Sequence, residues 1–236
     1  GSNGGIGTAI CQLLKEKGYF VIGTDRFPDN NNLDSFFELD IQTLATEDNL
    51  PAFISQIDQR LKGHRLMALI NNAAVQILSG IEDIKIDDFK QTLEVNLIAP
   101  LALTKSLYPY LKKNRGSVVN IGSIHSKLTK PGFISYATSK SAILGLTQAL
   151  AVDCGGYVRI NAIQPAATAT EMLLDGFKSK PEAFNELLSY HPTNSIASPK
   201  EIAEAVCFLI SDQCPFMNGS VLDINGGIGS RLHDPI

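Results

Sequence analysis

Short β-branched apolar runs alternate along the chain with longer runs in which apolar residues recur every three or four positions. Several short runs are continuously apolar, which is typical of strands buried on both faces. These runs predict strands over Tyr19–Thr24, Phe36–Asp40, Leu66–Asn71, Ser117–Ile121, Val158–Ile163 and Ser220–Ile224. The longer runs predict helices over Ile6–Lys17, Leu50–Leu61, Ile86–Lys112, Tyr136–Asp153 and Pro199–Ser211, with Ser198 as the N-cap of the last.

Strands that alternate with helices predict a Rossmann-like α/β fold, with a doubly wound parallel sheet. The chain shows no repeat or linker, so we expect residues 1–236 to form a single domain. In such a sheet a central strand precedes the glycine-rich loop, and this sequence opens on that loop. We therefore expect that the first strand, a few native N-terminal residues, is missing from the given sequence. Gly1-Ser2 could also be a cloning scar, although Gly1 fits the motif described next.

The chain begins with glycines at the spacing G-x-x-x-G-x-G, directly before the first expected helix. Glycines let backbone N–H groups approach a pyrophosphate, and a helix N-terminus supplies positive potential. A flexible glycine-rich terminus is the alternative interpretation. The dinucleotide interpretation assigns cofactor contacts to Gly1, Ser2, Asn3, Gly5, Ile6 and Gly7.

Asp25 follows the first expected strand, 18 residues after Gly7. An acidic residue near this spacing accepts hydrogen bonds from the adenosine ribose hydroxyls and repels a 2′-phosphate. The sequence therefore favours NAD over NADP. Arg26 complicates this expectation, because an adjacent guanidinium could pair with a phosphate instead.

Two copies of the pattern Y-x-x-x-K occur, at Tyr136–Lys140 and Tyr108–Lys112. Positions i and i+4 share one face of a helix, where a lysine cation is expected to lower the pKa of a phenol and fit it for acid–base chemistry. Only Tyr136 has a serine, Ser123, thirteen residues upstream at a strand end. We therefore expect Tyr136 to be the functional copy.

Over nearly its whole length the chain resembles the short-chain dehydrogenase/reductase family. The resemblance rests on seven ordered matches: the glycine loop, Asp40-Ile41, Asn71–Ala74, Asn96, the Ser123/Tyr136/Lys140 set, Pro165–Thr170 and Asn225–Gly227. The sequence departs from the family pattern at Ala74, Ala166 and Asn225. Ala74 and Ala166 replace glycines and Asn225 replaces an aspartate. Ala166 narrows the backbone conformations available there.

The resemblance implies an NAD(P)-dependent oxidoreductase that transfers a hydride between a nicotinamide and a carbonyl or secondary alcohol. Tyr136 would be the acid–base group, Ser123 would hold the substrate oxygen, Lys140 the nicotinamide ribose, and Asn96 a water-linked proton relay. An exposed polar position on a helix is the alternative for Asn96. Cofactor contacts would also come from Asp25, Arg26, Asp40, Ile41, Asn72, Ala73, Ala74, Tyr136, Lys140, Pro165, Thr168 and Thr170. A substrate lid is expected at about residues 170–197.

The substrate is expected to be a small molecule such as a 3-oxoacyl thioester, a sugar or polyol, or another secondary alcohol. His125, two residues after Ser123, could contact a polar substrate or face solvent. A non-catalytic cofactor-binding sensor on the same scaffold, or an epimerase, is the alternative function. The apolar circumference of the two long helices, together with the resemblance, predicts a homo-oligomer, and we expect a tetramer.

Composition and charge limit the partners and the cellular compartment that we expect for the protein. The net charge is −4 and no basic stripe is present, so we expect no nucleic-acid partner. No apolar run approaches the roughly 20 residues of a membrane span, and no signal peptide opens the sequence. The four cysteines lack metal-ligand spacing, and no other cluster suggests a metal. We expect reduced thiols in a cytoplasmic protein.

Overall fold

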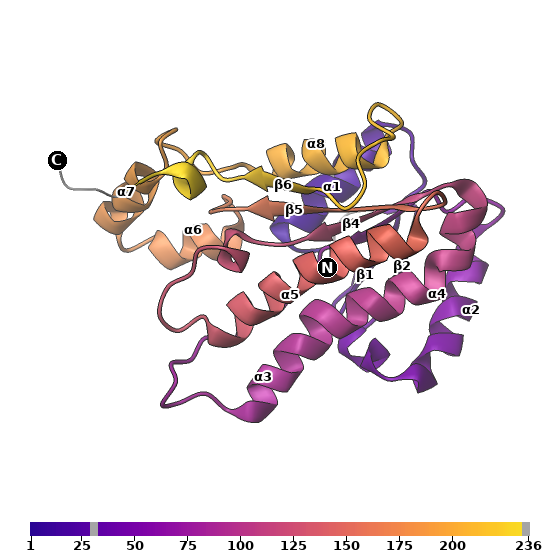
Figure 1. Ribbon diagram of the computed structural model, residues 1–236, viewed down its shortest axis with the longest axis horizontal. Coiled ribbons are helices and arrows are strands. Elements are labelled where there is room, and N and C mark those ends of the chain that lie inside the picture. Colours follow the sequence, from indigo (N-terminus) through magenta and orange to yellow (C-terminus); the bar gives the residue numbers. More distant parts are fainter. Residues whose placement is uncertain (29–32, 233–236) are drawn as a thin grey trace.

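The computed structural model describes residues 1–28 and 33–232, which form a parallel sheet between two layers of helices (Figure 1). This arrangement confirms the expected Rossmann-like α/β fold. The strands are β1 (Ile22–Asp25), β2 (Ser35–Glu38), β3 (Ala68–Asn71), β4 (Ser117–Ile121), β5 (Arg159–Pro165) and β6 (Val221–Ile224). The helices are α1 (Gly5–Glu16), α2 (Leu50–Leu61), α3 (Ile86–Leu93), α4 (Ala99–Asn114), α5 (Ile134–Cys154), α6 (Glu171–Phe177), α7 (Pro181–Tyr190) and α8 (Pro199–Ile210).

The sheet is divided into two parts, with the strand orders β1-β2 and β3-β4-β5-β6, and every pairing is parallel. Within the described residues, β1 has β2 as its partner and β3 has β4, and no ladder joins β1 to β3. The division falls at the position where a doubly wound sheet has its central strand.

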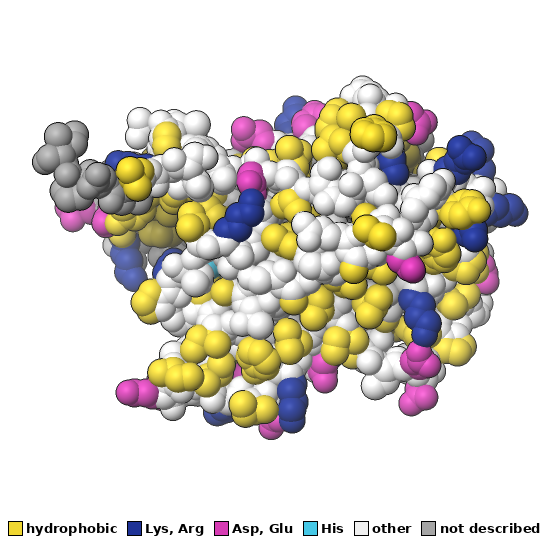
Figure 2. All heavy atoms as spheres, in the orientation of Figure 1, with side chains coloured by type: hydrophobic (Ala, Val, Ile, Leu, Met, Phe, Trp, Pro, Cys, Tyr) yellow, Lys and Arg dark blue, Asp and Glu magenta, His cyan; other side chains and the backbone are white. Residues whose placement is uncertain are grey.

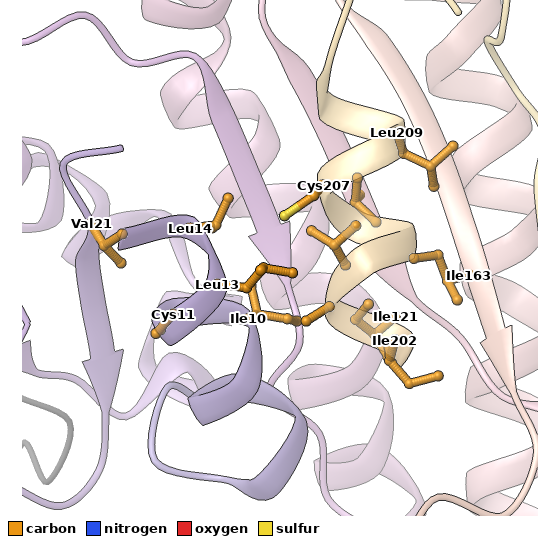
Figure 3. Close-up of a cluster of buried hydrophobic side chains, with 13 residues drawn as sticks. Ile10, Cys11, Leu13, Leu14, Val21, Ile121, Ile163, Ile202, Cys207 and Leu209 are labelled. Atoms are coloured by element: carbon orange, nitrogen blue, oxygen red, sulfur yellow. The ribbon is translucent and has the colours of Figure 1, made fainter. Parts of the chain in front are cut away.

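Alternate side chains of the central strands pack against opposite helix layers. Val119, Ile121 and Ile163 belong to the cluster that includes α1 and α8, part of which Figure 3 shows. Val118 and Ile160 belong to a second cluster, with residues of α2, α4 and α5. Both faces of β4 and β5 are therefore dry, which explains why their sequences are continuous apolar runs rather than alternating ones.

A row of buried polar side chains crosses the sheet between these clusters. The amide of Asn71 donates to Asn120 Oδ1 at 2.7 Å, and the Asn120 amide donates to Thr147 Oγ1 at 2.9 Å. Thr147 in turn donates to the carbonyl of Ile143 at 2.7 Å. Asn71 and Asn120 are register partners in the β3–β4 ladder. This row ties α5 to two strands by side-chain hydrogen bonds.

The helix expected over Ile86–Lys112 is confirmed, but it is not a regular α-helix throughout. A π-helical turn over Glu94–Ile98 separates α3 from α4, and α4 then continues through Pro109 to Asn114. Pro100 occupies the first turn of α4, where its missing N–H breaks no intrahelical bond. The expected strand Tyr19–Thr24 begins at Ile22 instead, because Val21 N–H is held by the Asp34 carboxylate at 2.9 Å.

The expected N-cap of α8 is confirmed, and further findings concern the cysteines, membrane spans and the region between β5 and α8. Ser198 caps α8 in a reciprocal capping box with Glu201. All four cysteines are free thiols, and three of them are buried. Among the residues that the structure describes, no helix has the length and apolar character needed to span a membrane. The region expected to be a lid contains two short helices, α6 and α7.

Candidate active site

The glycine-rich loop lies against the carboxyl edge of the sheet, where it leads into α1. A Cβ at Gly7 would lie 2.0 Å from the carbonyl oxygen of Gly1, and a Cβ at Gly1 would lie 2.7 Å from Ala73 Cα. These two glycines are therefore required by packing within the protein. Gly4 and Gly5 are exposed, which leaves the backbone at the start of α1 open to a ligand. A helix N-terminus with open backbone at this edge suits a pyrophosphate.

Two segments that the sequence predicted to bind the cofactor, one after β3 and one after β5, meet at this loop. The Asn72 amide donates to the Gly1 carbonyl at 2.8 Å. The methyl group of Thr170 lies 3.0 Å from where a Gly5 Cβ would stand, and the Thr170 hydroxyl caps α6. Thr168 is buried after Pro165, the last residue of β5. The structure thus brings Asn72, Ala73 and Thr170 to the loop, whereas Ala74 is exposed beyond it.

Asp25 ends β1 beside the loop. Its carboxylate accepts hydrogen bonds from the backbone N–H of Asn3 at 3.1 Å and of Arg26 at 2.8 Å. Partial burial acts to raise the pKa of Asp25, but the backbone hydrogen bonds from Asn3, Arg26 and Phe27 oppose it, and the pKa lies below its ordinary value. Arg26 is exposed and its guanidinium lies 5.8 Å from the Phe27 ring centroid. The Asp25 carboxylate is thus held in its anionic form beside the glycine-rich loop, at Asn3.

Asp40 and Ile41 lie at the next turn of the chain. The Asp40 carboxylate accepts the backbone N–H of Gln42 at 3.0 Å and caps a short 3₁₀ helix over Ile41–Ala45. The Ile41 side chain is buried in a small cluster with Val95 and Ala99, against which Ala73 also packs. The pair is therefore positioned through the segment that follows β3.

Ser123, Tyr136 and Lys140 converge between the end of β4 and the start of α5. The Ser123 side chain is buried and hydrogen-bonded to the Tyr136 side chain. Lys140 Nζ lies 5.5 Å from the Tyr136 ring centroid and donates to the carbonyl of Ile121, the last residue of β4, at 2.8 Å. One turn of α5 thus places a phenol and an ammonium group beside the serine, as the sequence predicted.

The expected lowering of the Tyr136 pKa is wrong for this structure. Burial raises the pKa of Tyr136, and the hydrogen bond from Ser123 offsets only part of that effect. Burial also lowers the pKa of Lys140 to about 8. Desolvation therefore dominates at both groups, because it penalises the phenolate and the ammonium alike.

Asn96 is buried in the π-helical turn, so its interpretation as an exposed polar residue is wrong. Its carboxamide accepts the N–H of Val75 and donates to the Val75 carbonyl, both at 2.9 Å. The same amide donates to Ser139 Oγ at 3.0 Å, and Ser139 donates to the Tyr136 carbonyl at 2.7 Å. Asn96 thereby joins the segment after β3 to the first turn of α5.

The surroundings of Tyr136 include His125, which the sequence analysis singled out, and also Phe133 and Gln164, which it missed. The His125 ring stacks on Phe133 at 4.2 Å between centroids, and both rings meet the Tyr136 ring edge-on. His125 Nδ1 lies 3.0 Å from Thr129 Oγ1. Gln164 is buried under the serine loop and hydrogen-bonds to Ser126. A lone glutamine within the apolar run of β5 was the available signal for that residue.

Tyr108 lies elsewhere in the molecule. It packs in the cluster below α4, and Lys112 Nζ stands 5.8 Å from its ring centroid. The last turn of α4 leads into the start of β4, at the amino edge of the sheet. Among the described residues, no group of three His, Cys, Asp or Glu side chains could hold a metal ion.

We expect Lys140 to make stability pH-dependent. Its pKa is about 8 in the folded protein against 10.5 for an ordinary lysine, so between these values the unfolded chain binds more protons. The free energy of unfolding should therefore rise with pH in this window, by roughly 2–3 kcal/mol. Urea unfolding at pH 8 and pH 10 should show this gain, and Lys140→Met should lose it. The exposed Lys113→Met control should keep it, and equal slopes for all three proteins would contradict the assignment.

Comparison with known proteins agrees with this geometry. A family model described as Enoyl-(Acyl carrier protein) reductase matches residues 1–229. The chain is 32% identical to Protein FixR of Bradyrhizobium diazoefficiens, over 96% of this chain and 84% of that protein. It is 30% identical to the 3-oxoacyl-[acyl-carrier-protein] reductase FabG of Thermotoga maritima, over 97% of this chain and 95% of that protein.

Among solved structures, the ligand-free aldohexose dehydrogenase of Thermoplasma acidophilum is similar, with a TM-score of 0.91 and 28% identity. That alignment covers 100% of this chain and 94% of the other. Fold, site geometry and relatives agree: the chain belongs to the short-chain dehydrogenase/reductase family of NAD(P)-dependent oxidoreductases, which act on carbonyl and alcohol groups.

Proposed function

We propose that Tyr136 is the acid–base group of this oxidoreductase and that Ser123 holds the substrate oxygen beside it. The observation that carries the proposal is the Ser123–Tyr136 hydrogen bond, with the buried Lys140 Nζ 5.5 Å from the Tyr136 ring centroid. The open backbone at Gly4 and Gly5 fits a dinucleotide, which supplies or accepts the hydride when bound. A sensor without turnover would have no use for this buried polar set.

The three side chains divide the work of moving a proton. In the direction of reduction, the hydroxyls of Ser123 and Tyr136 hydrogen-bond to the carbonyl oxygen and stabilise the charge that develops there. Tyr136 then gives its proton to that oxygen. Lys140, anchored on the Ile121 carbonyl, places a positive charge beneath the ring and stabilises the phenolate that results. We assign the nicotinamide ribose to Lys140 as well.

Asn96 and the lid complete the proposed site. Asn96 fixes the first turn of α5 through Ser139, and we propose that it also ends a water-linked relay to Lys140. α6 and α7 would cover the substrate, with Phe177 and Phe184 in edge-to-face contact at 5.6 Å. The candidate substrates are a 3-oxoacyl thioester, as the FabG relative's name says of that protein, an aldose or polyol, or another secondary alcohol. Measuring NAD(P)H turnover across these three classes would select among them.

We propose that the protein works in the cytoplasm. Its four cysteines are free thiols, and Cys11, Cys154 and Cys207 are buried in the core. Reducing compartments keep thiols in this state. Detection of the protein in the periplasmic or secreted fraction of its native cells would contradict the proposal.

Replacing Tyr136 with phenylalanine tests the central assignment. The change keeps the ring and its packing but removes the proton, so kcat should fall by about 10²–10⁴-fold while the cofactor Kd changes little. Tyr108→Phe is the matched control, because it sits in the same sequence pattern away from the site, and its kcat should stay close to that of the unmodified protein. Equal behaviour of the two variants in steady-state assays would refute the role of Tyr136.

We propose that NAD(H) binds more tightly than NADP(H), because the Asp25 carboxylate is anionic and fixed where the adenosine ribose would lie. Hydrogen bonds to a charged group contribute about 1.5–3 kcal/mol, so Asp25→Ala should weaken NAD binding by roughly 10–100-fold. The same change should narrow the gap to NADP by removing repulsion. Calorimetric Kd values for both cofactors check this. Tighter binding of NADP to the unmodified protein would assign Arg26 to a phosphate instead.

We propose a homotetramer that forms through the outer faces of α4 and α5. Ile98 in the π-helical turn before α4, Leu101 on α4 and Val152 on α5 are exposed, and Figure 2 shows apolar side chains gathered on this face. Ile143, also on α5, is buried in the core and lies outside this surface. Light scattering at micromolar concentration should give four times the chain mass, and Leu101→Glu should reduce it. Phe216→Glu, at an exposed side chain outside α4 and α5, should not, and a monomeric unmodified protein would contradict the proposal.

A further inference from the structure

Gln164 is a polar side chain on β5 that lies beneath the serine loop, residues 123–127, and it is 1% exposed. Its amide nitrogen donates to the hydroxyl of Ser126 and, at 3.4 Å, to the carbonyl of Ser123. The Ser126 hydroxyl in turn donates to the same Ser123 carbonyl at 2.8 Å. Gln164 therefore closes a small ring of hydrogen bonds around the backbone of the serine that contacts Tyr136.

The carboxamide of Gln164 can be oriented in one way only. A carbonyl oxygen accepts hydrogen bonds and cannot donate them, so the amide nitrogen must face Ser123. The amide oxygen of Gln164 is then buried, and no described residue gives it a hydrogen bond. A buried acceptor without a partner destabilises a protein. A methionine of similar length would avoid this loss of stability, so what the glutamine adds is the hydrogen bonding of its nitrogen.

The serine loop has two further anchors, and both lie nearer to solvent. The hydroxyl of Ser141, an exposed residue of α5, donates to the Ser126 carbonyl at 3.0 Å. The Lys127 ammonium pairs with the Asp223 carboxylate of β6 at 2.9 Å, and both side chains are exposed. Water can replace an exposed contact of this kind. Water cannot easily replace the contacts of the buried Gln164 amide, because a dry interior offers no other donor.

The serine loop also sets the direction of the Ser123 hydroxyl. The Ser123 backbone is extended, and its Oγ accepts the N–H of His125 at 3.2 Å. Because Oγ accepts a hydrogen bond there, its proton is available for the Tyr136 oxygen, to which the side chain is hydrogen-bonded. A rotation of the Ser123 carbonyl would turn the peptide groups that follow it and move the His125 N–H. The contacts of Gln164 oppose that rotation.

We propose that Gln164 is a positioning residue for catalysis: its buried amide fixes the carbonyl of Ser123 and thereby holds the Ser123 hydroxyl toward Tyr136. Gln164 acts through Ser123 and not on the substrate itself. The inference rests on the role proposed above for Ser123. It makes β5 a part of the catalytic centre, together with the end of β4 and the start of α5.

Replacing Gln164 with methionine keeps the length of the side chain and removes its hydrogen bonds. With the substrate selected by NAD(P)H turnover, we expect kcat to fall by about 10–100-fold, because a misdirected hydroxyl no longer meets the reacting oxygen. The cofactor Kd should not change. The midpoint of thermal unfolding should stay within about 3 °C of that of the unmodified protein, since Gln164→Met also loses the unpaired amide oxygen. Gln213→Met is the matched control at an exposed side chain and should keep full kcat.

Replacing Gln164 with glutamate separates hydrogen-bond donation from shape. A protonated glutamic acid can donate to the Ser126 hydroxyl as the amide does, whereas a carboxylate cannot donate. Burial and the carboxylate of Asp223, the register partner of Gln164, should raise the pKa of the new acid from about 4.3 to roughly 6–8. The kcat of Gln164→Glu, divided by that of the unmodified protein, should therefore fall at least about fivefold between about pH 6 and about pH 9.

The other titratable groups near this position are Tyr136 on α5, His125 and Lys127 on the serine loop, and Asp223 on β6. They are present in both proteins, so their titration cancels in the ratio of the kcat values. Gln213→Glu makes the same chemical change at an exposed side chain, and its ratio should stay constant over this pH range.

Ser123→Ala, measured in the same assay, distinguishes a failure of this inference from a failure of the proposed function. Full kcat in Ser123→Ala overturns the role proposed for Ser123, and the inference with it. Loss of kcat in Ser123→Ala together with full kcat in Gln164→Met overturns the inference alone. A constant ratio for Gln164→Glu, or a thermal midpoint of Gln164→Met that falls together with kcat, also overturns it, because Gln164 would then support only the fold.

Discussion

The burial of the Lys140 ammonium group is the constraint on which the rest of the site depends. Lys140 is 4% exposed, which is rare for a charged lysine, and its ammonium group donates a hydrogen bond to the carbonyl of Ile121. Desolvation of the ammonium group lowers the pKa of Lys140, and desolvation of the phenol raises the pKa of Tyr136. The cost of this desolvation follows from packing α5 against the end of β4, because Ile121, whose carbonyl accepts the hydrogen bond, is the last residue of that strand. Any structure that moved α5 outward to hydrate Lys140 would also separate Tyr136 from Ser123.

The position of α5 depends in turn on the π-helical turn between α3 and α4. One extra residue in that turn rotates the helix so that Asn96 points inward, toward Val75 and Ser139. In a regular α-helix the following face would shift by about 100° per residue, and Asn96 could not occupy this place. The turn thus exchanges regular backbone hydrogen bonds for a side-chain bridge between the segment that follows β3 and α5. Local irregularity here positions chemistry rather than marking weakness.

The order of strands and helices was readable from the sequence, because hydrophobic period and glycine positions depend on local geometry. The choice of Tyr136 over Tyr108 was also readable, since a strand end upstream identifies the carboxyl edge of the sheet. The extent to which the Tyr136 ring is buried could not be predicted from the sequence. The pattern Y-x-x-x-K implied a lowered tyrosine pKa, but the sign depends on how much water reaches the ring, and that depends on residues such as Phe133, which come from other turns. The π-helical turn at Asn96 was not predicted either, because the apolar spacing of the helix continues through it.

The buried row Asn71–Asn120–Thr147 has a consequence for folding accuracy. Parallel strands of similar apolar composition can align in several offsets with nearly equal burial of surface. An offset of one residue between β3 and β4 would carry each amide to the opposite face and leave its polar atoms in a dry core. Each stranded group costs about 1–3 kcal/mol, so two of them remove much of the stability of a typical domain. The amides therefore select the register. They add little to the stability of the correct alignment, but they raise the free energy of every alignment that is shifted by one residue.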